Sequence, residues 1–379
     1  MSLDCPERTV RRLLALGPAV GGVADSFSHT VTALGFDRKW RVEVWRVKED
    51  ATPLWSAVVS LGRNRRIIAD ADVLHVEFGS NDRTVFWLAL LLTLRRAVVA
   101  VVHDYPTLVK HPGAGVLPSS TRLTSMLGYR VMSPLLDDWL MRLFLRRAAC
   151  VAVLSDEARI GWRDGVRGGL VVIPHGSFPV SDRAVLPSMG RYVLFAGYIG
   201  QSKGVDLLLR AWEKIASASP LELVIAGESQ GVPDPELERL RVRAESLPSP
   251  PRWVGFVASE RELQDLIAKA AVVVLPYRKS SPASGILARA MLEGRAIVVS
   301  SVPATRTTIH DQLNGLLVAP GDVAELTDAL RRMIEDPALR DRLGASARAC
   351  ADRVFSSEIQ SGRLASAYER LLADKRVSG

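Results

Sequence analysis

The sequence contains few cysteines. Only Cys5, Cys150 and Cys350 occur in 379 residues, and they are far apart and odd in number. A small secreted domain stabilised by disulfides carries an even and closely spaced set. The N-terminal stretch MSLDCPERTV also lacks the basic and then apolar pattern of a secretory signal. We therefore expect a cytoplasmic protein whose cysteines are packing residues.

The sequence also lacks a long hydrophobic run. The apolar stretch 86–94 is less than half of the roughly 20 residues that a membrane span needs, and two arginines follow it directly. No long Ser-, Gly- or Pro-rich tract occurs, which argues against disorder. With 48% apolar residues and 379 positions, the chain has enough material for two hydrophobic cores.

Charge is distributed unevenly along the chain. Residues 1–180 carry 23 Lys and Arg against 17 Asp and Glu, whereas the remainder carries 26 against 24. This excess fits an anionic partner of the N-terminal half, such as phosphates or a phospholipid surface, and it equally fits an arginine-rich composition without function. No nucleic-acid-binding motif accompanies the net charge of +8, so we expect no nucleic-acid partner.

Short apolar runs alternate with helical patterns along the whole chain. Most of the runs are almost continuously apolar, which is typical of strands buried on both faces of a parallel sheet. The pattern predicts an α/β protein with two doubly wound, Rossmann-like domains. The Pro-, Gly- and Ser-containing stretch 175–190 is the expected linker, so we place the domains at 1–185 and 186–379. The runs predicted as strands are 11–18, 40–47, 72–78, 97–104, 150–155, 170–174, 191–198, 221–228, 251–257, 271–277 and 296–301.

Ligands of open α/β sheets bind beyond the carboxyl ends of the strands, so the residues after each strand are the first candidates. Gly21 and Gly22 follow the first strand, where they would allow a ligand close to the backbone. The alternative is an ordinary tight turn. The surrounding GPAVGGVADSF does not contain GxGxxG, which argues against a dinucleotide-binding site.

His103 lies at the end of another predicted strand, in HDYP, where an imidazole can exchange a hydrogen bond with a polar ligand. The alternative is a buried histidine satisfied by neighbouring backbone groups. His175, beside the linker, is a weaker candidate of the same kind.

Two further candidates follow strands of the second half. Lys203 precedes a long amphipathic helix, where a cation opposes the helix dipole unless an anion is bound there. Ser284 and Gly285 begin another helix after the strand 271–277, and free amides at a helix N-terminus attract phosphate. The sequence therefore predicts two phosphate-binding elements on one sheet edge, although a solvated lysine and a simple turn remain the alternatives.

The order and spacing of these motifs resemble GT-B glycosyltransferases of the retaining family 4 (group 1) type over nearly the whole chain. The matching pieces are GPAVGGVADSF, VVHDYP, VVIPHG, LFAGYIGQSKGVDLLLRAW, LELVIAGE, PRWVGFV and NGLLVAPGDVAELTDALRRMIEDP. The resemblance implies two Rossmann-like domains facing a cleft, with a nucleoside-diphosphate sugar as co-substrate, no cofactor and no metal. The C-terminal domain would hold the donor and the N-terminal domain the acceptor, and the terminal helix can pack back on the N-terminal domain.

The resemblance also assigns expected roles to particular residues. Lys203 and the amides of Ser284, Gly285, Ile286 and Leu287 would stabilise the leaving diphosphate. His103 would contact the donor sugar or the transferring region from the N-terminal side. Gly21 and Gly22 would approach the donor, and the nucleotide base would lie near Gly255, Phe256 and Glu228.

The chain departs from the family pattern at the donor site. Relatives usually carry two glutamates where Ser281 and Arg289 stand here, so neither glutamate contact can be transferred, although Ser281 stays among the donor-site candidates. A subset of the family lacks this pair too. The arginine that usually accompanies Lys203 is also missing, and Arg278 or Lys279 is expected to substitute. Arg289 is expected to face either the ligand or the solvent.

Two functional hypotheses follow. The first is a retaining glycosyltransferase acting on a lipid-linked, polysaccharide or small-molecule acceptor, with UDP and GDP donors both open. The second is a non-catalytic GT-B-like protein that binds a nucleotide or a partner. The segments 86–96 and 139–147 combine apolar residues with arginines, so we expect peripheral association with an anionic inner membrane face. The alternative is that these segments are buried against the sheet.

Overall fold

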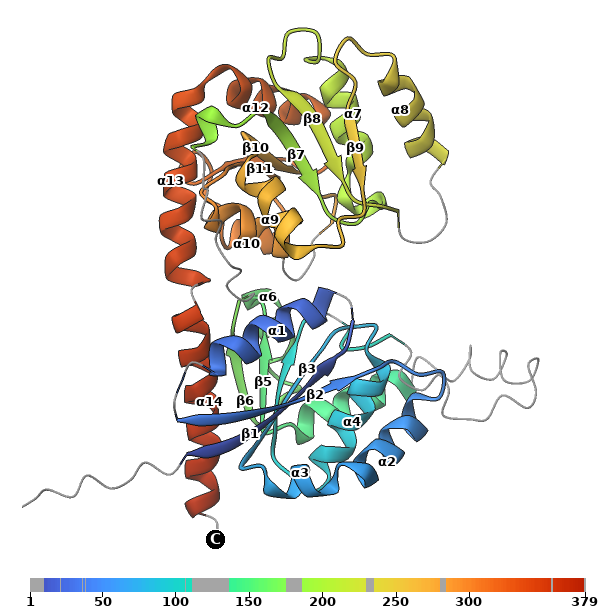
Figure 1. Cartoon of the computed structure of the whole chain (residues 1–379), viewed down its shortest axis with the longest axis vertical. Helices are drawn as coiled ribbons and strands as arrows, with labels where there is room; N and C mark the ends of the chain where they lie inside the picture. The colour runs from blue at the N-terminus through green and yellow to red at the C-terminus, as the bar shows by residue number, and fades with distance from the viewer. Residues whose placement is uncertain are drawn as a thin grey trace, which may run out of the picture. The chain divides into compact units, whose positions relative to one another are not determined.

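The computed structural model describes residues 10–20, 22–35, 37, 39–105, 107–110, 136–174, 186–229, 235–279, 284–355 and 357–377. The chain divides into two compact units (Figure 1). Unit 1 comprises residues 1–176 and 357–379, and unit 2 comprises residues 177–356. The boundary expected near residue 185 falls in 175–185, outside the described residues. The C-terminal helix thus belongs to unit 1.

Unit 1 is built on a six-stranded parallel sheet with the order β2-β1-β3-β4-β5-β6. Its strands are β1 (Arg11–Pro18), β2 (Trp40–Val47), β3 (Val73–Phe78), β4 (Val98–Val102), β5 (Cys150–Val153) and β6 (Gly169–Val172). Its helices are α1 (Gly22–Gly35), α2 (Pro53–Arg63), α3 (Arg65–Asp70), α4 (Arg83–Thr93), a helix over 136–147, α6 (Asp156–Trp162) and α14 (Ser357–Val377).

Alternation along β3 divides its side chains between the two faces of this sheet. Leu74, Val76 and Phe78 belong to a core that α2, α4 and the 136–147 helix complete. His75 and Glu77 point to the opposite face, where α14 packs beside α1 (Figure 1). The two sides of one strand therefore serve different purposes, because one is entirely apolar and the other carries ionisable groups.

Unit 2 carries a second six-stranded parallel sheet with the order β12-β11-β10-β7-β8-β9. Its strands are β7 (Tyr192–Ala196), β8 (Glu222–Ala226), β9 (Arg252–Gly255), β10 (Val272–Leu275), β11 (Ala296–Ser300) and β12 (Leu316–Val318). The predicted α/β class with two doubly wound parallel sheets is confirmed. Sequence analysis missed β12, because three residues are too few to show a period.

Helices cover both faces of the second sheet. They are α7 (Val205–Glu213), α8 (Pro235–Glu245), α9 (Glu260–Ala268), α10 (Gly285–Leu292), α11 (Pro303–Arg306), α12 (Val323–Glu335) and α13 (Pro337–Val354), with short 3₁₀ turns η1 (Pro187–Met189) and η2 (Gln201–Lys203). One core lies between the sheet and α7 and α12, and includes the fully buried Trp212. The other lies under α10 and α13.

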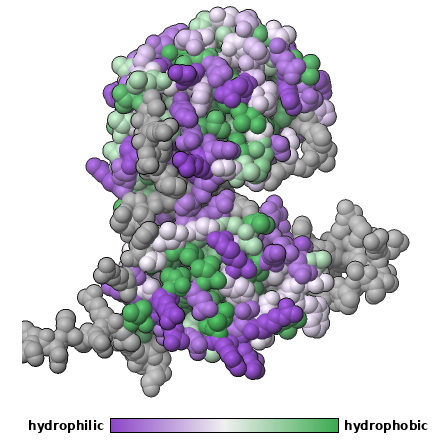
Figure 2. Space-filling view, viewed as in Figure 1, coloured by the Kyte–Doolittle hydropathy of each residue, from purple (hydrophilic) through white to green (hydrophobic). Residues whose placement is uncertain are grey.

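The two arginine-flanked apolar segments have different environments. Nearly all of α4 is buried in the core of unit 1, which favours the alternative that 86–96 packs against the sheet, although Leu94 at its end is 51% exposed. The 136–147 helix buries Leu140 and Phe144 but leaves Trp139 58% exposed. Figure 2 shows apolar and polar residues interspersed over the visible face of each unit. None of the described helices is long and apolar enough to span a membrane.

The turn at Gly204 gives a first prediction. Gly204 has φ of 68°, and a Cβ there would lie 2.0 Å from the carbonyl oxygen of Pro276. An alanine in the left-handed backbone conformation usually costs about 1–2 kcal/mol. Gly204→Ala should lower the free energy of unfolding of unit 2 by more than this, because the clash with the Pro276 carbonyl adds to that cost. Thermal unfolding measures this. Gly62→Ala in α2 meets nothing within 4 Å and should be neutral or slightly stabilising, and equal melting temperatures for the two variants would contradict the assignment.

Candidate functional site

Strand order predicts where a ligand binds in unit 2. The order reverses between β7 and β10, and such a switch point leaves a crevice at the carboxyl ends of the two strands. The loop after β7 leads to η2 and Lys203, and the loop after β10 leads to the N-terminus of α10. The two predicted phosphate-binding elements therefore follow the two strands that flank the switch point.

Lys203 lies against an aromatic ring at this point. Its ammonium is 4.4 Å from the ring centroid of Tyr277, a cation–π distance. Burial lowers the pKa of Lys203. The Lys203 ammonium lies against the Tyr277 ring, and the residue is only partly exposed. Its charge is therefore poorly solvated, and a bound anion would compensate it.

Tyr277 links the lysine to the start of α10. The Tyr277 side chain is 3% exposed, and its hydroxyl is 2.9 Å from Ser284 Oγ. Ser284 is the N-cap of α10, and its Oγ accepts the Leu287 N–H at 3.2 Å. Tyr277 is not among the residues predicted from the sequence. The available signal was its place directly after the buried strand β10, followed by the Ser-rich turn.

This cap corrects one part of the expected phosphate cradle. The Leu287 amide already donates to Ser284, so it is not one of the amides that await an anion. The amides of Gly285 and Ile286 lie in the first turn of α10, where the N–H groups have no partner within the helix. Ser281 lies outside the described residues.

The Arg278 side chain forms an ion pair within unit 2. Its guanidinium makes two hydrogen bonds to the Asp206 carboxylate in the first turn of α7, and a third to the Gln201 carbonyl oxygen. The expectation that Arg278 replaces the missing family arginine is therefore not supported by this geometry. Arg278 instead ties the loop after β10 to the loop after β7.

Arg289 faces neither the solvent nor the crevice. The side chain is buried and donates to Glu260 Oε1 at 2.6 Å and to Gln264 Oε1 at 3.2 Å. Gln264 in turn donates to Glu293 Oε1 at 2.6 Å. Both alternatives expected from the sequence are wrong, because Arg289 joins α10 to α9 through a buried network.

An exposed aromatic pair marks the other end of this sheet edge. Tyr198 and Phe256 follow β7 and β9, are 43% and 54% exposed, and stack with centroids 6.2 Å apart and an interplanar angle of 19°. Gly255 has φ of 75°, and a Cβ on it would lie 3.6 Å from Glu228 Oε1. The structure thus brings Glu228, Gly255 and Phe256 together, as expected for one subsite, and adds Tyr198.

Of the candidate residues of unit 1, the structure describes His103 and Gly22. His103 follows β4, is 7% exposed, and its Nε2 is 2.6 Å from Glu77 Oε1. This buried histidine is therefore hydrogen-bonded to a carboxylate. The alternative given from the sequence was a buried histidine hydrogen-bonded to backbone groups. Gly22 is the first residue of α1. Gly21 and His175 lie outside the described residues.

Acidic groups gather near His103. Asp82 accepts the Gly79 N–H at 2.7 Å, and Asp104 accepts the Ser80 N–H at 2.5 Å. The pKa of Asp82 is raised to about 6, chiefly by burial and also by the nearby charges of Glu49 and Asp104, while the Gly79 hydrogen bond and His103 act in the opposite direction. Asp82 and Asp104 therefore place acidic groups at the described ends of β3 and β4, with Lys110 beside them, its N–H donating to the Ser80 carbonyl oxygen.

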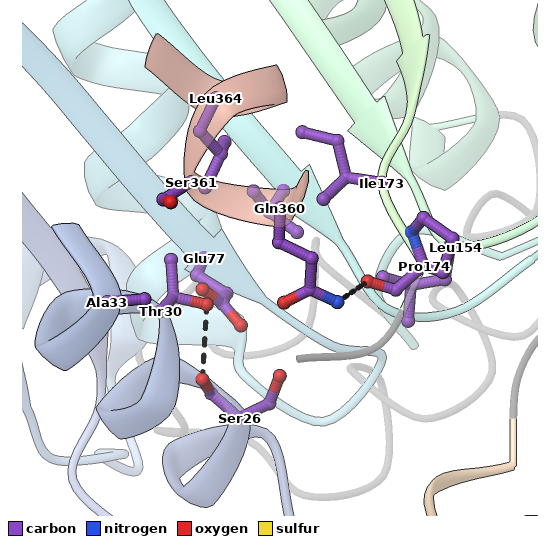
Figure 3. Close-up of a pocket in the computed structure, with 11 residues that line it drawn as sticks. Ser26, Thr30, Ala33, Glu77, Leu154, Ile173, Pro174, Gln360, Ser361 and Leu364 are labelled. Atoms are coloured by element: carbon purple, nitrogen blue, oxygen red, sulfur yellow. Dashed lines mark hydrogen bonds between the residues drawn. The ribbon is translucent and has the colours of Figure 1, made fainter. Parts of the chain in front are cut away.

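A small cavity lies beside Glu77. It has a volume of about 20 Å³, room for about one water molecule and too little for a sugar. Figure 3 shows Glu77 between Thr30 of α1 and Gln360 of α14, with Gln360 Nε2 donating to the Pro174 carbonyl oxygen. Within the described part of the chain, no three His, Cys, Asp or Glu side chains form a group that could hold a metal ion.

Comparison with known proteins supports the resemblance. Residues 190–336 match the family model described as "Glycosyl transferases group 1". The chain is 28% identical to alpha-D-kanosaminyltransferase of Streptomyces kanamyceticus over 72% of this chain and 70% of that protein. It is 27% identical to phosphatidyl-myo-inositol mannosyltransferase of Mycobacterium leprae over 83% and 77%. Several other curated relatives are matched over only about half of their length.

A solved structure shares the fold. Anabaena HepE in complex with UDP-glucose superposes with a TM-score of 0.68 at 16% identity, covering 95% of this chain and 99% of that chain. An identity this low shows the fold alone, which is GT-B.

The raised pKa of Asp82 predicts a pH-dependent stability. Because the folded state binds the Asp82 proton more tightly than the unfolded state, ionisation destabilises the fold as the pH rises from about 4 to 6. Asp82→Asn keeps an oxygen that can accept the Gly79 N–H and removes this ionisation. The variant should melt higher than wild type at pH 8 and equally at pH 4. The exposed Asp138 offers the control Asp138→Asn, and a gain that is the same at both pH values would show that ionisation of Asp82 is not its cause.

Proposed function

We propose that this chain, a GT-B protein of the group 1 glycosyltransferase type, transfers a sugar from a nucleoside-diphosphate sugar to an acceptor hydroxyl. The observation that carries the proposal is the convergence of Lys203, Tyr277 and the α10 N-terminus at the switch point of unit 2. A cation and helix amides at one place suit a diphosphate. HepE binds UDP-glucose, which supports a UDP-sugar as the first donor to test; GDP-sugars are the next.

The proposed chemistry is the transfer of a glycosyl group with retention. A bond forms between the acceptor oxygen and the anomeric carbon while the bond from that carbon to the β-phosphate oxygen breaks, and the acceptor proton passes to the departing diphosphate. Charge grows on the phosphate as this happens. Lys203 and the Gly285 and Ile286 amides would stabilise that charge and take the part that a divalent cation plays in metal-dependent transfer.

The nucleotide base is assigned to the far end of the same sheet edge. Phe256 offers an exposed ring face, and Gly255 allows the backbone to approach a planar group closely. Glu228 would accept hydrogen bonds from base or ribose hydroxyls. His103 would contact the donor sugar from unit 1.

The acceptor is proposed to be lipid-linked or an envelope-polysaccharide precursor. One relative acts on phosphatidyl-myo-inositol, by its name. The 136–147 helix exposes Trp139 together with Arg142 and Arg146, a combination that suits an anionic leaflet. We therefore propose a cytoplasmic enzyme that associates peripherally with the inner membrane face.

A second candidate function is nucleotide binding without transfer. Arg289 stands where the family usually has a glutamate, and its burial against α9 leaves that contact to the donor unreplaced. A protein that binds UDP or GDP but releases neither from any sugar nucleotide, with matched acceptors present, would fit this alternative better than the enzyme.

The proposal predicts a large effect of Lys203→Ala. Removing one charge-stabilising group should lower kcat roughly 10²- to 10³-fold, by analogy with loss of an oxyanion donor. Release of UDP or GDP from sugar nucleotides measures this. Lys214→Ala, at the exposed C-terminal end of α7, is the matched control and should retain the wild-type rate. Equal rates for Lys203→Ala and wild type would remove Lys203 from the mechanism.

The membrane part has its own test. The protein should float with vesicles containing anionic lipid at low salt and dissociate as the salt rises, since each arginine near an anionic leaflet contributes about 1 kcal/mol. Trp139→Ser combined with Arg142→Ser should weaken flotation. No binding to anionic vesicles at low salt would leave a soluble acceptor as the better hypothesis.

A further inference from the structure

Glu77 is a buried carboxylate that the proposed chemistry does not use. It is 1% exposed and lies on β3 with one oxygen toward each of two imidazoles. Oε1 is 2.6 Å from His103 Nε2, a short hydrogen bond, and Oε2 faces His75 Nε2 at 3.6 Å, too far for a hydrogen bond. A charge enclosed in this way is costly unless its neighbours compensate it.

The two imidazoles keep this carboxylate ionised. Burial raises the pKa of Glu77, but the contacts with His103 and His75 outweigh burial and bring the pKa to about 2. An ionised carboxylate accepts hydrogen bonds and donates none. The hydrogen of the 2.6 Å contact must therefore come from His103 Nε2.

The C-terminal helix holds the other side of the carboxylate. The Tyr368 hydroxyl of α14 is 2.9 Å from His75 Nδ1, and the Tyr368 ring packs edge-on against both His75 and Trp40. Burial and the Glu77 charge raise the pKa of Tyr368 well above its ordinary value, so the phenol stays protonated and can donate to His75 Nδ1. His75 then carries its hydrogen on Nε2, facing Glu77 Oε2.

We propose that Glu77 is a positioning residue that fixes His103 as the Nε2–H tautomer and sets its ring orientation. His75 and Tyr368 act one step behind, because Tyr368 fixes the His75 ring through Nδ1 and that ring faces Glu77 Oε2 at 3.6 Å. This rests on the proposed role of His103 in transfer.

A positioning role differs from a hydrogen bond that serves stability alone. A carboxylate that accepts from Nε2 fixes the tautomer in either case. A structural role predicts that loss of Glu77 lowers stability alone, whereas a positioning role predicts that kcat also falls in a variant that still folds. The tautomer tests whether Glu77 sets the state of His103, and kcat separates the two roles.

The test measures the tautomer directly, without requiring activity. In ¹⁵N-histidine-labelled protein, two-bond ¹⁵N–¹H correlation spectra should show His103 as the Nε2–H form, with His103→Gln used to assign its signals. Glu77→Leu removes the acceptor at similar size and should abolish this preference. Glu77→Gln keeps an acceptor oxygen without the charge and should preserve it in part. An Nδ1–H form of His103 in wild type, or an unchanged spectrum in Glu77→Leu, would overturn the proposal.

Kinetics provide the second readout. Misplacing the His103 ring should lower kcat about 10²-fold in Glu77→Leu, with a smaller loss in Glu77→Gln. Tyr368→Phe should change the His75 signals and lower kcat less than Glu77→Leu. Tyr192→Phe is the matched control, because it also removes a buried tyrosine hydroxyl, one that donates to the Leu266 carbonyl oxygen, and it should leave the histidine spectrum unchanged.

Failure of the two proposals can be told apart. If wild type turns over no sugar nucleotide, the proposed function fails while the spectrum still decides the role of Glu77. If Glu77→Leu does not fold, the wild-type tautomer and Glu77→Gln decide it. Turnover that is normal in a folded Glu77→Leu variant would show that His103 needs no positioning.

Discussion

Burial of parallel strands on both faces is the constraint on which the rest of the molecule depends. Such strands admit almost only apolar side chains, so polar chemistry is confined to the loops at their ends. In unit 2 this brings Lys203 and Ser284 to one edge, although 81 positions of sequence separate them. In unit 1 the rule has an exception, because His75 and Glu77 lie inside a strand and depend on each other for compensation.

The fold could be predicted from the sequence, and so could the sheet edge at which the donor site is proposed. Continuous apolar runs identified eleven of the twelve described strands, and the residues after 191–198 and 271–277 indicated the switch point. β12 escaped because it is three residues long. The sequence showed that the segments 86–96 and 139–147 are apolar and carry arginines. It could not show which face of each helix is buried, because that depends on the sheet that the helix covers. In the structure, α4 is buried on nearly all sides.

The partners of long charged side chains could not be predicted. The sequence shows that Arg289 lies one turn into α10, but its partners Glu260 and Gln264 are 29 and 25 positions away on another helix. The Tyr368–His75 contact joins residues 293 positions apart. Local sequence patterns carry no information about such pairs. The ion pair of Arg278 with Asp206 could not be predicted for the same reason, since only the packing of α7 against the loop after β10 reveals it.

Membership of α14 in unit 1 has a consequence for the order in which the chain matures. During translation, residues 177–356 are synthesised after β6, the last strand of the first sheet, and before α14, the helix that packs on that sheet. Until α14 is synthesised, Trp40 and His75 lack their edge-on contact with the Tyr368 ring, and the Glu77 carboxylate is not fully buried. Unit 1 is therefore the unit that is synthesised first and completed last. While unit 2 folds, the nascent chain exposes the partly apolar sheet face that α14 will cover, and this face must not aggregate.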